Sequence, residues 1–73
     1  MQYGDLVKAT YTPTDLDPHP PTREGVVVCT DLGDDLTQVY FGTLEDYSVY
    51  LNEGYFQEAA DFTGVFYPHE LTR

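Results

Sequence analysis

Positively charged side chains are scarce in this chain of 73 residues, which has three Lys and Arg against thirteen Asp and Glu. The formal net charge is therefore −10. Proteins bind nucleic-acid phosphates mainly through Lys and Arg, so this composition argues against direct binding to nucleic acid. From Glu24 to Glu70 there are ten carboxylates and no Lys or Arg, so these carboxylates have no cationic partner within that segment. We therefore expect a surface of unpaired negative charge.

Other absences narrow the class of protein. The single cysteine, Cys29, cannot form a disulfide within the chain, and its apolar neighbours suit a buried thiol in a reducing compartment. No apolar run approaches the roughly 18 residues of a membrane helix, and we see no basic n-region, so we expect neither a membrane span nor a signal peptide. We find no Gly-rich phosphate loop, nucleophile elbow or spaced Cys/His ligand set. We expect a soluble cytoplasmic protein with no membrane contact, no catalytic residues, no cofactor and no metal.

The densest apolar segment, residues 25–41, predicts the centre of a single domain that spans residues 1–73. Two β-rich runs, 25–30 and 36–41, flank a Gly/Asp-rich segment, which is the pattern of a β-hairpin. In the first run Val26 and Val28 share one face and Val27 the other. We therefore expect this strand to be covered on both sides.

Shorter β-type runs lie on either side of this hairpin. Residues 3–11 alternate in polarity as a strand does, and residues 12–22 hold four of the five prolines, which predicts a long, stiff loop. Residues 65–67 predict a last strand. The following segment, 68–71, resembles a single tight turn that returns Leu71 to the core.

Residues Thr43 to Phe62 fit two structures. The start of the segment has the form of a helix capping box, and apolar residues follow at helical spacing. Residues 47–51, however, are rich in strand formers, and residues 52–54 form a turn signal before Tyr55. We favour two short strands, with one short helix over residues 57–61 as the main alternative.

The order of these segments resembles a family. The motifs Gly4-Asp5-Leu6-Val7, Glu24-Gly25-Val26-Val27-Val28, Gln38-Val39-Tyr40-Phe41 and Tyr67-Pro68-His69-Glu70-Leu71 are similar to those of small SH3-like barrel proteins of bacteriophages and bacteria. The resemblance covers about half of the chain and implies a mainly β fold, an antiparallel barrel of about five strands with the long loop after the first strand. The insertion from Leu44 to Phe62 departs from the family pattern.

The excess of carboxylates suggests a function. Alternate residues of a strand lie about 6.6 Å apart along one face, which is close to the spacing of neighbouring phosphates. A row of carboxylates could therefore occupy a nucleic-acid-binding site, as in the acidic DNA-mimic inhibitors of phages that this chain resembles in charge. We predict a partner that is a basic nucleic-acid-binding protein, in the host cytoplasm if a phage encodes the chain. The predicted contact residues are Asp31, Asp34, Asp35, Glu45, Asp46, Glu53, Glu58, Asp61, Tyr40, Tyr47, Tyr50 and Tyr55.

The alternative is a small structural or protein-interaction module without an inhibitory role. In that case Tyr11, Tyr40 and Tyr67 would line an aromatic groove beside the Pro-rich loop. Binding of this kind should depend little on salt, whereas binding through carboxylates should depend on it strongly.

Overall fold

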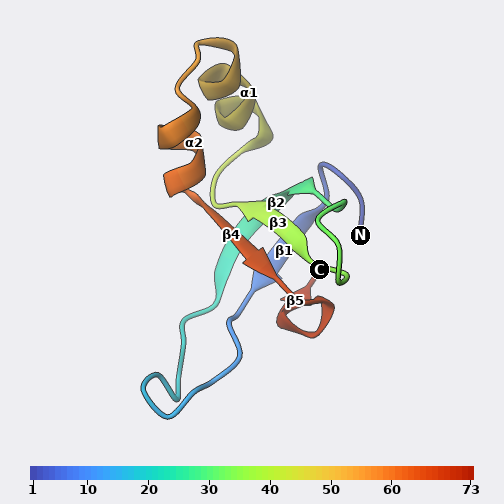
Figure 1. Cartoon of the computed structure of the whole chain (residues 1–73), viewed down its shortest axis with the longest axis vertical. Coiled ribbons are helices and arrows are strands. Elements are labelled where there is room, and N and C mark those ends of the chain that lie inside the picture. Colours follow the sequence, from blue (N-terminus) through green and yellow to red (C-terminus); the bar gives the residue numbers. More distant parts are fainter.

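One antiparallel sheet of five strands forms the centre of the molecule (Figure 1). The structure is a computed structural model that describes all 73 residues. The elements are β1 (Leu6–Ala9), β2 (Arg23–Cys29), β3 (Thr37–Tyr40), α1 (Leu44–Asn52), α2 (Phe56–Asp61), β4 (Thr63–Phe66), the 3-10 turn η1 (Pro68–Glu70) and β5 (Leu71–Thr72). The strand order is β4-β3-β2-β1-β5, and no ladder joins the two edge strands. The predicted mainly β fold and the central hairpin are confirmed.

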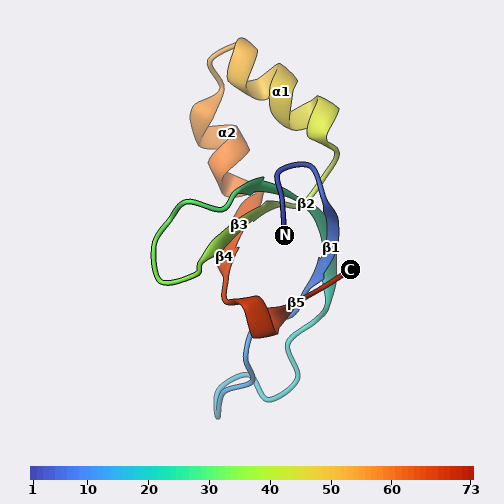
Figure 2. The same ribbon diagram turned by 90° about the vertical axis from the view of Figure 1, so that its right-hand side faces the viewer.

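The core of the sheet includes residues from all five strands. Val7 and Ala9 from β1, Val27, Val39, Phe66 and Leu71 form one buried cluster. Because this cluster joins the two edge strands, the sheet must curl around it, and Figure 2 shows that curl. Only residues 67–70 connect β4 to β5, which also requires the two edges to lie close together.

The opposite face of β2 is buried as well, as the sequence predicts. Val26, Val28 and Tyr40 form a second buried cluster, against which side chains of α1 pack. Cys29, expected to be fully buried, is half-buried and follows a register shift in the pairing of β2 with β3.

The insertion is a pair of helices, so the two short strands expected between Thr43 and Phe62 are wrong. The hydroxyl of Thr43 accepts a hydrogen bond from the backbone N–H of Asp46, which caps α1 as the sequence indicated. Leu44, Tyr47 and Tyr50 then lie on one side of α1 and pack against the second cluster. Burial of that side outweighs the strand preference of residues 47–51.

The turn signal before Tyr55 ends a helix and does not begin a strand. Gly54 has φ +80°, and its N–H donates to the carbonyl of Leu51. The N–H of Tyr55 donates to the carbonyl of Tyr50 at 2.8 Å. These two bonds form a Schellman motif, which needs a residue with positive φ and therefore favours glycine.

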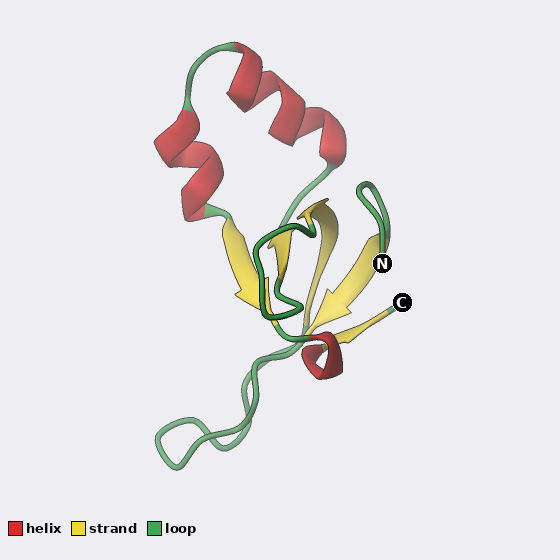
Figure 3. Cartoon of the chain, turned by 45° about the vertical axis from the view of Figure 1, so that its right-hand side comes forward, coloured by secondary structure: helices red, strands yellow, loops and turns green.

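The helices and the connection between β1 and β2 lie at opposite ends of the molecule (Figure 3). Residues 10–22 of this connection contain no helix or strand. Its start is held to η1 by Glu70, whose carboxylate accepts hydrogen bonds from the backbone N–H of Thr12 at 2.6 Å and from the Thr12 hydroxyl at 2.9 Å. The ring of Tyr11 stacks on Phe66 with 4.4 Å between centroids, so the same segment covers one end of the core.

Candidate acidic binding surface

Three of the predicted carboxylates lie in the turn between β2 and β3. Asp31, Asp34 and Asp35 are all exposed. Asp34 and Asp35 have φ of 51° and 61°, a region that Asp tolerates better than most residues. The turn therefore holds these side chains in solvent close to one another along the chain.

Five more predicted carboxylates lie on the helical pair, and all five are exposed: Glu45, Asp46, Glu53, Glu58 and Asp61. Glu45 and Asp46 occupy the first turn of α1, where the helix dipole favours negative charge. Asp61 accepts a hydrogen bond from the side-chain amide of Gln57 at 2.9 Å. The segment from residue 42 to residue 62 contains no Lys, Arg or His.

The two groups of carboxylates do not form one row along a strand. The turn precedes Thr37 and the helices follow Tyr40, so the groups lie at opposite ends of β3. Four strand residues span about 10 Å. The expectation of a strand-spaced row is wrong because none of the eight carboxylates lies in a strand. The chain presents an acidic turn and an acidic helical pair.

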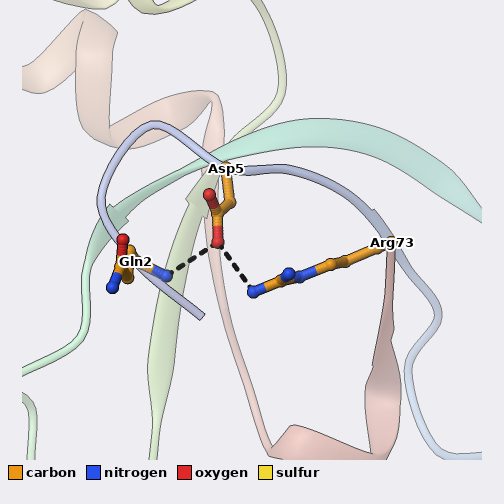
Figure 4. A network of polar contacts seen from close by, with 3 residues as sticks. All are labelled: Gln2, Asp5 and Arg73. Carbon is orange, nitrogen blue, oxygen red and sulfur yellow. Dashed lines mark hydrogen bonds and ion pairs between the residues drawn. The ribbon is translucent and has the colours of Figure 1, made fainter.

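Ion pairing leaves nearly all of this charge unneutralised. The one ion pair joins Arg73 Nη2 to Asp5 Oδ2 at 3.1 Å, and the N–H of Gln2 donates to the same oxygen (Figure 4). The guanidinium carbon of Arg23 lies 3.8 Å from the centre of the Phe41 ring. Lys8 forms no ion pair. The ten carboxylates from Glu24 to Glu70 are therefore without an ion pair.

The predicted tyrosines divide into core and surface residues. Tyr40 is only 4% exposed, and its ring packs at a tilt against that of Tyr47 with 5.1 Å between centroids. Tyr40 therefore cannot offer contact area, and this part of the prediction is wrong. Burial raises the pKa of both phenols. Tyr50 is half-buried against the second cluster. Tyr55 is 49% exposed, so it alone of the four is a surface residue.

Sequence reasoning missed two exposed aromatic residues. Phe56 is 64% exposed and Phe62 is 47% exposed, and they flank the other residues of α2. The expected strands would alternate such side chains between core and solvent, whereas the helix leaves both rings exposed. The three carboxylates in residues 53–61, with no cation among them, were the signal that this stretch is a surface.

Elsewhere the surface has two hollows, of which the larger has a volume of about 410 Å³. Leu6, Val7, Lys8, Glu24, Gly25 and Gly42 line it. The two charged residues of this lining are Lys8 on β1 and Glu24 on β2, which are directly paired in the ladder. No group of three His, Cys, Asp or Glu side chains lies close enough together to hold a metal ion.

The helices of the molecule are too short and too polar to cross a membrane. Comparison of the chain with models of protein families, with curated proteins and with solved structures finds no match.

Proposed function

We propose that this protein is an acidic inhibitor that binds a basic nucleic-acid-binding protein and blocks its nucleic-acid site. The observation that supports this most is the run of ten carboxylates from Glu24 to Glu70 without a single ion pair. Self-repulsion of that charge destabilises the fold. A partner with Lys and Arg at its surface would relieve the repulsion on binding.

Carboxylates can replace phosphates in such a site because both are anions that accept hydrogen bonds from Lys and Arg. Opposite charges also steer the two proteins together, so association should be fast and should slow strongly as salt is added. The sign of the charge disfavours direct contact with nucleic acid and favours contact with proteins that bind it.

We further propose that the curled sheet is a small SH3-like barrel. In support, the sheet order β4-β3-β2-β1-β5 brings the two edge strands to either end of the short η1 connection. The helical pair then replaces the short connection that usually joins the third and fourth strands of such barrels. Fold alone carries no function, and the inhibitory role rests on the charge.

The proposal is tested by capture from a nuclease-treated bacterial lysate, followed by a challenge with duplex DNA. Recovery of a basic nucleic-acid-binding protein that DNA releases is the expected result. Association rates are then measured for the wild type and for a variant carrying Asp34→Asn, Asp35→Asn, Glu45→Gln and Asp46→Asn. Slower association of the variant at low salt is expected. A partner that DNA does not release, or equal association rates, would refute the inhibitory role.

A second candidate function is an interaction module that binds through aromatic side chains. Tyr11 and Tyr67 are 48% and 50% exposed, and Tyr67 stacks on His69 with 5.8 Å between ring centroids. These residues lie near η1, where residues 10–12 meet it. Tyr67→Ala would abolish such binding, and the affinity of the wild type would change little with salt.

A further inference from the structure

We propose that the α2 surface, formed by the exposed Tyr55, Phe56 and Phe62 together with Glu53, Glu58 and Asp61, is the contact that recognises the partner. This inference rests on the proposed function and gives it a location. The occupant is a protein surface with an apolar centre and a surround of Lys and Arg. The acidic turn between β2 and β3 contributes general attraction only.

The three exposed aromatic residues come from one short segment, since Phe56 begins α2 and the other two lie at its caps. A helix of six residues is about 9 Å long, and Tyr55 and Phe62 are the residues that cap its two ends. Ala59 is the only buried residue of α2, so the helix contributes little to the core. Large exposed aromatic residues grouped on one short element, in a domain with so few core residues, indicate a surface that becomes covered on binding.

The charges beside these aromatic residues identify what covers them. Residues 53–62 carry Glu53, Glu58 and Asp61 and no cation, and none of the three is in an ion pair. A second copy of this chain would bring these three carboxylates against three more, with a net charge of −10 on each molecule. Like charges placed together across an interface oppose binding. A basic partner with an apolar centre satisfies both the rings and the carboxylates.

The test uses the full chain and two synthetic helical peptides of equal positive charge. One peptide has Lys on one face and Leu on the other, and the second has Ser in place of Leu. Fluorescence anisotropy of the labelled peptides gives the affinities. The Lys/Leu peptide should bind the wild type about tenfold or more tightly than the Lys/Ser peptide, because hot-spot aromatic contacts contribute on that scale.

Matched variants locate the contact. Phe56→Ser should lower the affinity for the Lys/Leu peptide about tenfold, whereas Leu16→Ser should leave it unchanged, since Leu16 is a 99% exposed apolar residue far from α2 in sequence. The triple variant Glu53→Gln, Glu58→Gln, Asp61→Asn should weaken binding more than Asp31→Asn, Asp34→Asn, Asp35→Asn does. Both triple variants change the net charge by the same amount. Circular dichroism checks that each variant remains folded.

Three results would overturn the proposal. These are equal affinity for the two peptides, no effect of Phe56→Ser or Phe62→Ser, and equal effects of the two triple variants. Failure of the proposed function has a different signature. If the peptides bind at the α2 surface but DNA releases no partner, the inhibitory role fails and the contact stands. If DNA releases a captured partner, but Phe56→Ser does not change the affinity for that partner, the α2 surface is not the contact and the inhibitory role is retained.

Discussion

Glu70 is expected to contribute more to stability than any other carboxylate of this chain. Its Oε2 accepts hydrogen bonds from the N–H and the hydroxyl of Thr12, and its Oε1 accepts from the N–H of Tyr67 at 2.8 Å. The first two bonds join residues 58 positions apart in the sequence. Glu70 therefore fixes the long connection after β1 to η1, just before β5.

The expected loss on Glu70→Gln follows from these contacts. A bond to a charged acceptor contributes about 1.5–3 kcal/mol. The amide has one oxygen, so either Tyr67 or Thr12 loses its acceptor and meets an NH2 group instead. Because Glu70 is only half-buried, water can reach the abandoned donor, and we expect a loss of about 1–3 kcal/mol. In a domain of this size each kcal/mol lowers Tm by about 4–8 °C.

The pH dependence gives a second measure of the same contacts. Burial opposes the charged form of Glu70, but the hydrogen bonds from Tyr67 and Thr12, with His69 nearby, lower its pKa from the usual 4.5. When the pKa of a carboxyl group is lower in the folded state, the group stabilises the fold at pH values above its pKa in the unfolded state. This stability is lost as the pH falls through the pKa of the folded state. The difference between wild type and Glu70→Gln should therefore be full at pH 7 and shrink below pH 4.5.

Urea and thermal denaturation followed by circular dichroism measure this difference. Glu53→Gln is the matched control, because Glu53 is exposed and its substitution changes the net charge equally. Subtracting the control removes the general relief of repulsion between carboxylates. If Glu70→Gln and Glu53→Gln have the same stability at pH 7, or if their difference does not change between pH 7 and pH 3, the reasoning is wrong.

Further predictions concern the core, a cap, the terminal ion pair and the total charge. Phe66→Ala removes a ring that is 1% exposed and should cost about 3–5 kcal/mol in urea denaturation followed by circular dichroism, a large part of the about 4–11 kcal/mol that stabilises a chain of 73 residues. Thr43→Ala should cost about 1 kcal/mol and weaken hydrogen-exchange protection in α1 first; uniform loss of protection would contradict a local cap. Arg73→Ala should change stability by less than about 1 kcal/mol, since its side chain is 68% exposed, and a larger loss in urea denaturation would mean that the terminal contact is stronger than a surface ion pair. Added sodium chloride should raise Tm by screening the unpaired carboxylates, and a Tm independent of salt would show that they are too dispersed to repel one another.

The sheet was predictable because its signals are local and agree with one another. The valines of β2 alternate between two faces, and both faces prove to be buried. The tight turn before Leu71 is confirmed as η1, and Leu71 is buried in the core. In each case chain connectivity and burial indicate the same structure. The apolar residues at these positions were therefore sufficient to predict the local fold.

The helical pair was predicted only in part. The alternative of a short helix over residues 57–61 matches α2, whereas α1 was not favoured because local preference and tertiary packing disagree there. The strand-forming residues 47–51 became helical because Tyr47 and its neighbours on α1 cover Val26, Val28 and Tyr40. The sequence predicts that both faces of β2 are covered, but it does not show which segment of the chain covers the outer face. The same packing buries Tyr40, so the misjudged helix and the misplaced tyrosine have one cause. A Gly after Asn-Glu fits both a strand turn and a Schellman motif.

The number of carboxylates is a property of the composition, and their lack of partners follows from the absence of Lys and Arg between Glu24 and Glu70, so neither depends on the structure of residues 43–62. Their arrangement, in contrast, depends on the fold. Had residues 43–62 been strands, the carboxylates would alternate with core residues along an extended row. As helices, the same residues place the exposed Glu58 and Asp61 on the six-residue α2, which begins at the exposed Phe56 and is capped by the exposed Phe62. A row of charge alone would favour a partner that recognises any polyanion, whereas charge beside exposed rings favours a partner that also has an apolar centre. The secondary structure of this one segment therefore determines which kind of partner the same composition can recognise.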